Sequence, residues 1–364
     1  MKRADVAIVG AGIAGASLAA EIAGEASVLL LEAEDQPGYH ATGRSAAFWA
    51  ESYGGRFIQP LTSASGSFLD AGGFLRPRGA LHLADAEGRA DLDRMRRELA
   101  SVVRLDTLDA AALRRRIPGL RPGWDQGLFE GSCADIDVAA LHASYLKTAR
   151  RKGAELRPRA RLERAERGPR GWSLETAAGR FEADIVVNAA GAWADEVAIL
   201  AGVGPIGIQP YRRTIVQVKV DPPAPAGLPL VIDALGRFYF KPEAGGRIWL
   251  SPHDETACDP CDCAPEEYDV ALAIDRLQKV VDWRVDRVEH QWAGLRSFAA
   301  DRLPVYGYAP GRDDFFWYAG QGGFGIQTAP AGAKLAASLL LGRAPEMMVG
   351  HIDPAPYLAE RFAN

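Results

Sequence analysis

The sequence predicts an α/β (α+β) fold in which a discontinuous domain built on a parallel βαβ unit is interrupted by a second domain built on an antiparallel sheet. Three observations predict this arrangement. A glycine-rich turn separates a strand pattern from a helix pattern near the start, alternating strand patterns fill the middle, and patterns of the first kind return towards the end. With 364 residues, 48% of them hydrophobic, the chain is long enough to bury the cores of two domains.

The first elements form one unit. Asp5–Val9 is an apolar run typical of a strand, Ile13–Ile22 has the composition of a helix, and Val28–Leu31 predicts a second buried strand. A βαβ unit of about thirty residues is the size of one mononucleotide-binding half of a Rossmann-type fold. Basic residues ahead of an apolar run can also indicate a secretory signal, but the spaced glycines and interrupting acids favour strand, turn and helix.

The later elements follow from their periodicity. Helix patterns cover residues 92–99, 110–116 and 141–151, another opens at Pro265, and the last runs from about Thr328 to Leu341 and ends at Gly342. Strand patterns cover residues 171–176, 183–187, 211–220 and 238–250. The last two strand patterns alternate with period two, as strands of an exposed antiparallel sheet do.

Gly10, Gly12 and Gly15 form a G-x-G-x-x-G motif between the first strand and the first helix. Gly10 permits the tight turn, Gly12 lets the backbone approach a pyrophosphate, and Gly15 lets the helix pack against the strand. The helix N-terminus then presents free N–H groups to the phosphates. Glu32 follows at the end of the second strand, where a carboxylate can accept a hydrogen bond from the adenosine ribose. The motif predicts a dinucleotide, and alone it does not separate FAD from NAD.

Longer segments carry a family resemblance. Residues 32–47 read EAEDQPGYHATGRSAA, and segments 133–137, 187–193, 292–297 and 320–328 follow them in order. These segments resemble those of the D-amino-acid oxidase-like FAD enzymes, most of all bacterial D-arginine dehydrogenase, over essentially the whole chain. The resemblance implies a discontinuous FAD-binding Rossmann-type (glutathione-reductase-like) domain of residues 1–78, 136–202 and 296–364. It assigns residues 79–135 and 203–295 to a substrate domain.

Motif and resemblance together place the cofactor contacts. The expected FAD-binding residues are Gly10, Gly12, Ile13, Ala14, Gly15, Glu32, Ala33, Thr42, Arg44, Ser45, Ala46, Ala47, Ala190, Gly191, Trp193, Gly294, Gly322, Gly323, Phe324, Gly325, Ile326 and Gln327. Residues 322–325 open the last helix, so its positive end can stabilise the negative charge that the flavin N1/C2=O edge gains on reduction. No cysteine lies in or next to the flavin-facing segments, which predicts a non-covalently held FAD.

Two arginines match those that hold the substrate carboxylate in the D-arginine dehydrogenase pattern. Arg213 lies on the strand pattern 211–220, and Arg296 lies between Leu295 and Ser297. A carboxylate requires a planar, always charged partner, which arginine supplies. Arg212 must point to the opposite face of the strand from Arg213.

Three further residues match the active site of the family. Tyr53 and Tyr239 match tyrosines whose hydroxyls contact the substrate carboxylate or amine, although a tyrosine near a strand is more commonly structural. Gln327 matches a polar residue near the flavin, and Phe324 is expected to pack over the substrate or the flavin ring. Catalytic roles are therefore expected for Arg213, Arg296, Tyr53, Tyr239 and Gln327.

The sequence differs from the D-arginine dehydrogenase pattern at several positions, and these differences change the expected substrate. Phe48 stands where the D-arginine enzyme has a histidine near the substrate amine, so water or Tyr53 would accept the proton. Ala80 aligns with the acid that reads the guanidinium, and Ala50 with a threonine of the lid. Because an unpaired buried cation costs several kcal/mol, we expect a neutral, apolar or aromatic substrate side chain. Glu51 would restore an acid only if it turned inward.

The cysteines and the net charge limit which metals and macromolecules the chain is expected to bind. Cys258, Cys261 and Cys263 have a C-x-x-C-x-C spacing that could bind zinc, but no second paired knuckle accompanies them, so no metal is expected. The net charge of −5 argues against nucleic acid as a partner. No apolar stretch reaches the ~20 residues that span a bilayer, and the few cysteines fit a reducing compartment. We therefore expect a cytoplasmic monomer or dimer.

The sequence thus predicts an FAD-dependent oxidation of an α-amino acid, of D configuration, to an imino acid and then a keto acid plus ammonia. An N-substituted amino acid or a 2-hydroxy acid offers the same carboxylate to Arg213 and Arg296 and remains an alternative. So does a flavin-binding subunit without turnover of its own. The sequence leaves open whether the electron acceptor is oxygen, a quinone or an electron carrier, and so leaves open oxidase or dehydrogenase.

Overall fold

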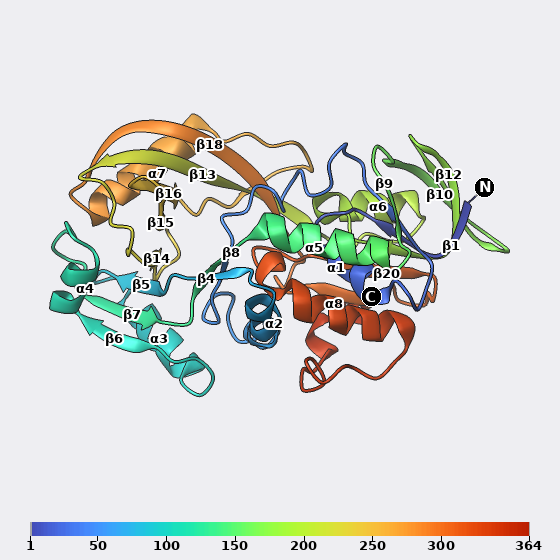
Figure 1. Cartoon of the computed structure of the whole chain (residues 1–364), viewed down its shortest axis with the longest axis horizontal. Coiled ribbons are helices and arrows are strands. Elements are labelled where there is room, and N and C mark those ends of the chain that lie inside the picture. The colour runs from blue at the N-terminus through green and yellow to red at the C-terminus, as the bar shows by residue number, and fades with distance from the viewer. Residues whose placement is uncertain (1, 364) are drawn as a thin grey trace.

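The computed structural model describes residues 2–363 and shows an elongated molecule with two lobes (Figure 1). The first lobe is built on an eight-stranded sheet. Its central strands run in the order β12, β1, β2, β9, all parallel, while β10, β11 and β19 pair antiparallel at the sides. The strands of this sheet are β1 (Lys2–Val9), β2 (Val28–Leu31), β9 (Glu155–Arg157), β10 (Leu162–Gly168), β11 (Gly171–Thr176), β12 (Gly179–Asn188), β19 (Val305–Tyr308) and β20 (Phe315–Ala319).

Helices cover both faces of this sheet. Val6 and Ile8 point from β1 into a core shared with α1 (Ile13–Ile22), α5 (Val138–Arg151) and α8 (Gly325–Leu341). Ala7 and Val9 point to the opposite face, where α6 (Ala194–Leu200) packs behind the 3-10 turn η1 (Gly191–Trp193). A sheet buried on both faces has strands that are apolar throughout, which explains why β2 reads Val-Leu-Leu-Leu.

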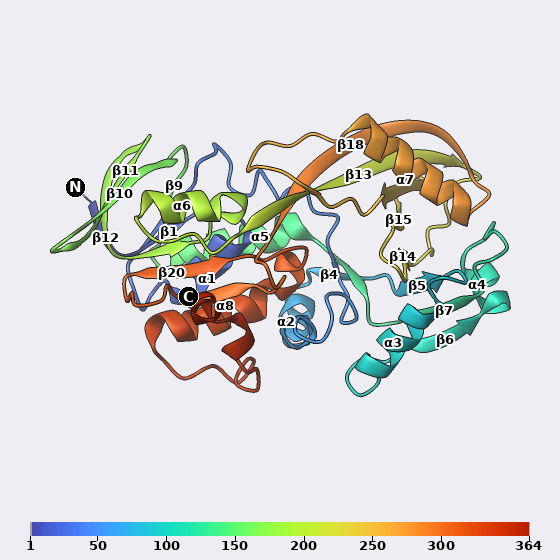
Figure 2. The same cartoon turned by 180° about the vertical axis from the view of Figure 1, so that it is seen from behind.

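The second lobe is built on a nine-stranded, mostly antiparallel sheet, in the order β17, β13, β16, β15, β14, β5, β7, β6, with β18 paired to the other side of β13. Helices α7 (Glu267–Val280), α3 (Arg89–Leu99) and α4 (Ala110–Arg116) lie against it (Figure 2). Its strands are β5 (Ala80–Ala84), β6 (Asp106–Asp109), β7 (Gln126–Glu130), β13 (Gln209–Asp221), β14 (Leu230–Asp233), β15 (Tyr239–Glu243), β16 (Arg247–Ser251), β17 (Thr256–Ala257) and β18 (Arg284–Phe298).

Long strands and a small sheet join the lobes. In both views β13 and β18 run side by side from the second lobe towards the first (Figures 1 and 2). A three-stranded sheet of β3 (Phe48–Trp49), β8 (Ala134–Ile136) and β4 (Leu75–Pro77) lies between the lobes, next to α2 (Gln59–Ala71). Short 3-10 turns η2 (Ala355–Tyr357) and η3 (Ala359–Phe362) follow α8. The junction brings segments that are far apart in the sequence to one place.

The α/β fold class predicted from the sequence is confirmed, although one predicted strand is wrong and several strands, among them the long β18, were not predicted. The pattern 238–250 was expected as a single strand, but it is the hairpin β15–β16, because Gly245 and Gly246 turn the chain with φ of 76° and 73°. Strand β18 was not predicted, since its outer half is too exposed and charged to alternate cleanly. The two sheets use the parts of the chain expected for the two domains, and the domain boundaries remain a prediction. Among residues 2–363, no helix is long and apolar enough to cross a membrane.

Candidate cofactor and substrate site

The glycine turn brings β1, α1 and the loop after β12 into close contact. Gly10 has a φ of 101°, and a Cβ there would overlap the carbonyl oxygen of Ala189. A Cβ at Gly15 would overlap the carbonyl oxygen of Gly10. At Gly12, where α1 begins, a Cβ would lie 3.2 Å from the Thr42 hydroxyl, which accepts a hydrogen bond from the Ile13 N–H at 2.9 Å. Side chains are excluded from this turn, so the turn leaves its backbone exposed to a ligand.

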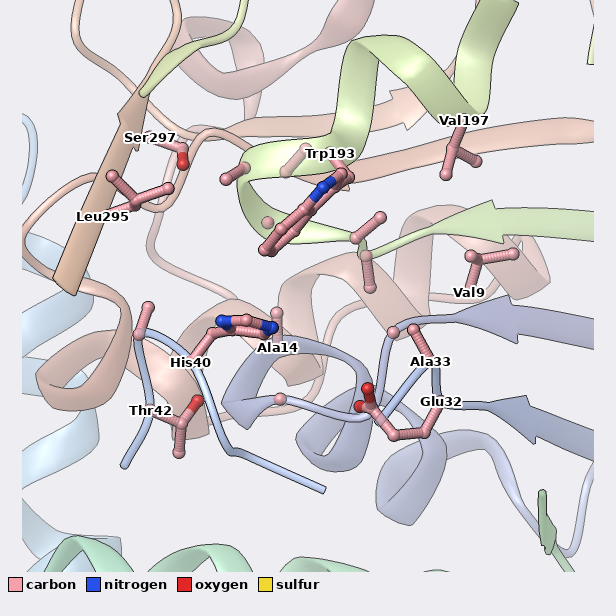
Figure 3. A pocket seen from close by; sticks show the side chains of 18 of the residues that line it. Val9, Ala14, Glu32, Ala33, His40, Thr42, Trp193, Val197, Leu295 and Ser297 are labelled. Carbon is pink, nitrogen blue, oxygen red and sulfur yellow. The ribbon is translucent and has the colours of Figure 1, made fainter. Parts of the chain in front are cut away.

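A large cavity opens in front of this turn. Counted together with the open solvent at its mouth it comprises about 1330 Å³, and it extends from Glu32 to Ser297 (Figure 3). Of the expected cofactor residues, those that line it are Gly10, Gly12, Ile13, Ala14, Glu32, Ala33, Thr42, Arg44, Ala190, Gly191, Trp193 and Gly322. A long, open cavity that begins at a helix N-terminus fits an extended dinucleotide.

Glu32 is fixed at one end of the cavity. Its side chain is buried at the end of β2, and its two carboxylate oxygens accept the N–H groups of Ala11 and Glu34, each at 3.0 Å. His142 contacts the carbonyl oxygen of Ala11 at 2.8 Å from the other side. The acid therefore has a set orientation at the end of the strand where the ribose was expected.

His40 and Trp193 face each other across the middle of the cavity (Figure 3). Their ring centroids are 4.6 Å apart, and His40 Nε2 lies 3.0 Å from a carboxylate oxygen of Glu34. Trp193 is among the residues that the sequence predicts to bind FAD, whereas His40 is not. The prediction also omits the cavity-lining residues Leu295, Ser297 and Gln321, although all of these lie in the segments that carry the resemblance. The sequence does not show in which direction these side chains point, and that direction decides which of them line the cavity.

The second lobe closes one side of the cavity through Arg44. Its guanidinium forms an ion pair with Asp262 and donates to the carbonyl oxygens of Cys263 and Ala293, each at 3.1 Å. Cys261 and Cys263 line the cavity. No cysteine was expected in or next to the flavin-facing segments, and these two belong to the loop 258–263; the non-covalent linkage remains a prediction. Among residues 2–363, no group of three or more His, Cys, Asp or Glu side chains could hold a metal ion.

A smaller cavity adjoins the large one and holds about 320 Å³ of empty space. It contains four of the five residues expected to be catalytic, Tyr53, Tyr239, Arg296 and Gln327. It is also lined by Phe48 and by the expected cofactor residues Ser45, Ala46, Ala47, Gly323 and Ile326. The expected cofactor residues Gly15, Gly294, Phe324 and Gly325 line neither cavity. Gly15 and Gly294 instead allow close packing, since a Cβ at Gly294 would lie 3.2 Å from Cβ of Arg44.

Arg296 and Arg213 are placed differently. Arg296 lines the small cavity, and its Nη1 donates to the Tyr53 hydroxyl at 3.0 Å. Arg213 is buried behind the cavity wall, where its Nε donates to the Asp254 carbonyl at 2.8 Å and its Nη2 to Glu255 at 3.1 Å. Burial and the charge of Arg296 lower the pKa of Arg213 to about 10, so it stays charged at neutral pH. Arg213 Nη1 has no partner among the described residues.

The Arg212 side chain points to the opposite face of β13 from Arg213, as expected from the alternation of side chains along a strand. It forms ion pairs with Glu266 and with Asp269 of α7, the second at 3.0 Å. Glu266 is the N-cap residue of that helix, and Asp269 lies in its acidic first turn.

Gln327 uses its amide to hold a loop. Its Nε2 donates to the Tyr53 carbonyl at 3.1 Å and to the Thr62 hydroxyl at 2.9 Å, and its Oε1 accepts the Ala50 N–H at 3.4 Å. It lines the small cavity together with Tyr53 and Arg296. Its contacts indicate that it positions the segment that carries Tyr53.

Aromatic residues line part of the small cavity, and other apolar residues pack behind them. The Phe48 ring lies 5.1 Å from Tyr53 and 6.2 Å from Tyr239, and the Tyr53 ring lies 5.3 Å from Phe324. Ala50 and Ala80 are fully buried in the same apolar cluster. Glu51 accepts hydrogen bonds from Ser63 and Ser132 and does not line the cavity, so it does not restore an acid there.

His253, which the sequence places near the cysteines of the loop 258–263, lies behind Tyr239. The ring centroids of Tyr239 and His253 are 5.6 Å apart. Burial, with the charges of Arg213 and Arg296, lowers the pKa of His253 well below its usual value, and burial raises the pKa of Tyr239. Both groups are therefore neutral at physiological pH.

The fold and the two adjoining cavities define the class of protein to which this chain belongs. A Rossmann-type unit with a dinucleotide-sized cavity, joined to a small arginine-containing cavity under an antiparallel sheet, is typical of a two-domain flavin-dependent oxidoreductase. Comparison with known proteins agrees, and residues 5–339 match the DAO family, described as FAD dependent oxidoreductase. The chain belongs to this family, and FAD is its cofactor.

Three known proteins illustrate the similarity. Glycine oxidase from Pseudomonas aeruginosa is 31% identical over 257 residues, which are 66% of this chain and 64% of that protein. The chain therefore spans just under two thirds of the length of that relative. A glycine oxidase structure from Geobacillus kaustophilus superimposes with a TM-score of 0.85 at 24% identity, covering 99% of both chains. An L-proline dehydrogenase structure from P. horikoshii also gives 0.85, at 20% identity, covering 100% of this chain and 98% of that one.

Proposed function

We propose that the protein oxidises the Cα–N bond of an α-amino acid, of D configuration and with a neutral apolar or aromatic side chain, to the imino acid. Water then hydrolyses the imino acid to a keto acid and ammonia. The observation that carries the proposal is Arg296, a guanidinium in the wall of the small cavity whose hydrogen-bond partner among the described residues is the uncharged Tyr53 hydroxyl. Such a group provides a charge-assisted site for a carboxylate.

The other residues of the cavity orient the substrate. Arg296 binds the carboxylate, and the Tyr53 and Tyr239 hydroxyls flank it. Arg213 adds positive potential from behind the wall while it remains tied to Glu255. Bound FAD would supply the acceptor for the hydride that leaves Cα. The residues that line the small cavity include no histidine, so the amine proton passes to water or to Tyr53.

The apolar wall sets the substrate preference. Phe48, Ala50 and Ala80 share one buried cluster with Tyr239, and no carboxylate lines the cavity. A cationic side chain would be buried without a counter-charge, which costs several kcal/mol. Names of relatives, such as glycine oxidase, support an amino acid as the substrate. The D configuration rests on the family resemblance.

The test is anaerobic bleaching of the flavin in the purified protein by D- and L-amino acids, glycine, sarcosine and 2-hydroxy acids. We expect bleaching by apolar or aromatic D-amino acids and little or none by D-arginine. Bleaching only by L-amino acids, or only by N-methyl or hydroxy compounds, would overturn the proposed substrate and keep the role of Arg296. No bleaching by any of them would favour a flavin-binding subunit without turnover.

A further inference from the structure

The segment that carries Tyr53 is held from two lobes. We call residues 50–55, which follow β3, the Tyr53 loop. On one side Gln327 of α8 bonds the Ala50 N–H and the Tyr53 carbonyl. A turn bond from the Tyr53 N–H to the Ala50 carbonyl, at 3.1 Å, closes the loop. Gln327 belongs to the first lobe, so a second contact is needed to fix the loop against the second lobe.

Glu130 makes that second contact. It ends β7, directly opposite Ala80 of β5, and is 0% exposed. Its carboxylate accepts the Glu51 N–H at 2.7 Å, the Ser52 N–H at 3.4 Å and the Ser52 hydroxyl. Three donors of the Tyr53 loop thus converge on one buried carboxylate.

His82 completes the group from the neighbouring strand. Its Nε2 lies 2.7 Å from the Ser52 Oγ. When Glu130 is ionised and the Ser52 proton is used on it, the His82 Nε2–H donates to Ser52. This tautomer leaves a bare lone pair on His82 Nδ1, which has no partner among the described residues. Burial lowers the pKa of His82 to about 4, in keeping with a neutral ring.

The charge of Glu130 makes these donors important. Among the described residues, no lysine or arginine forms an ion pair with Glu130; the nearby cations Arg78 and Lys241 both pair with Asp135. A buried carboxylate without a cation depends on its hydrogen-bond donors. Opening the Tyr53 loop would remove its three donors at once and leave the Ser132 hydroxyl, at 3.2 Å, as the remaining donor to Glu130 among the described residues, so the closed loop is favoured.

We propose that Glu130, with Ser52 and His82, is a positioning group that latches the Tyr53 loop to the second lobe and thereby holds the Tyr53 hydroxyl against Arg296. The inference rests on the proposed function only in its kinetic consequence, because Arg296 must then bind the substrate carboxylate. The latch itself is a property of the protein without substrate. Sequence separations of 30 and 78 residues from Ser52 concealed it in the chain.

The experiment compares Glu130→Gln with the wild-type holoenzyme by hydrogen exchange of peptides that cover residues 48–58. An amide in place of the carboxylate cannot accept all three donors, so we expect the amides of Glu51 and Ser52 to exchange roughly tenfold faster or more. Asp233→Asn is the matched control, since Asp233 is equally buried in the same sheet but bonds Arg237. Exchange in the loop that is unchanged, or that rises equally in the control, would overturn the latch.

Kinetics and a second variant separate positioning from general destabilisation. With the substrate that bleaches the flavin, Glu130→Gln should raise the dissociation constant about fivefold or more and change the limiting reduction rate less than about twofold. Ser52→Ala should loosen the loop in the same way, and the double variant should be no looser than Glu130→Gln. If the effects of Glu130→Gln and Ser52→Ala on loop exchange were additive, the positioning role would be overturned. It would also be overturned if only the limiting rate of flavin reduction fell. If no substrate bleaches the flavin, the proposed function fails while loop exchange still decides the latch.

Discussion

At the scale of single residues, the two expected carboxylate-binding arginines have different environments. Arg296 ends in the small cavity, whereas Arg213 is tied to Asp254 and Glu255 behind it. Both are on adjacent strands, and Arg213 pairs with Gly294 rather than with Arg296 in the register. Direct contact with the substrate is therefore expected from Arg296, and support from Arg213.

Replacing Arg296 with Met should leave FAD bound and weaken substrate binding. The loss of a charge-assisted pair, about 1.5–3 kcal/mol, corresponds to roughly 10- to 150-fold in the dissociation constant. Titration of flavin bleaching measures it, with flavin content as the check on folding. Arg287→Met, an exposed arginine of the same strand, is the control. Unchanged kinetics in Arg296→Met would refute the carboxylate role.

Gly323→Ala should perturb the same guanidinium without a change of charge. A Cβ there would lie 2.9 Å from Nη1 and 3.2 Å from Cζ of Arg296, so the arginine must move. The end of a flexible side chain can yield, and we expect a folded, FAD-containing protein with substrate affinity reduced several-fold. Steady-state kinetics with a melting curve would measure both. Wild-type affinity would show that Arg296 relaxes without consequence.

At the scale of elements, the glycine turn decides whether α1 can pack on β1. Gly15→Ala would place a methyl group on the Gly10 carbonyl, whereas Gly12→Ala would meet only the Thr42 hydroxyl. Overpacking costs typically about 1–3 kcal/mol or more. We therefore expect Gly15→Ala to lower the melting temperature of the apoprotein far more than Gly12→Ala does. Equal effects would mean that the packing role of Gly15 is wrong.

The loop 258–263 is the element whose place only the structure reveals. Because Cys261 and Cys263 line the large cavity, bound FAD should slow their alkylation by iodoacetamide relative to the apoprotein. Cys258 lies outside the cavity and should change little, and the fully buried Cys133 should stay unreactive. Mass spectrometry of the labelled peptides measures this. A flavin that remains on a peptide after denaturation would instead reveal a covalent linkage, against the prediction of non-covalent binding.

At the scale of the whole molecule, a buried neutral histidine makes stability depend on pH. Burial lowers the pKa of His82 from 6.5 to about 4, so the unfolded chain binds a proton in that window while the folded chain does not. The free energy of unfolding therefore falls as pH falls from 6.5 towards 4, by about 3 kcal/mol from this group. The stabilisation is fully present above pH 6.5.

Chemical denaturation of wild type and His82→Gln at pH 7 and pH 4.5 tests this. The variant should lose less stability between the two pH values than the wild type, whatever its stability at pH 7. His351→Gln, at an exposed position, is the control and should follow the wild type. An identical pH dependence in all three proteins would show that His82 titrates normally in the fold.

Local patterns determined much of this protein from sequence alone. The bounds of α1, β2, α4 and β11 follow from periodicity, and the glycine spacing with Glu32 predicts the dinucleotide site, because these features depend on neighbours a few residues apart. The residues of the small cavity came from the resemblance to a family, and its position between two sheets did not follow from any single segment.

Only the tertiary structure decided how distant side chains meet. It placed Arg296 in the cavity and Arg213 behind it, set the loop 258–263 over the cofactor site, and joined Ser52 to Glu130. The physical reason is that a strand pattern indicates which face a side chain occupies, whereas the pairing of β13 with β18 and of β5 with β7 decides what that face meets.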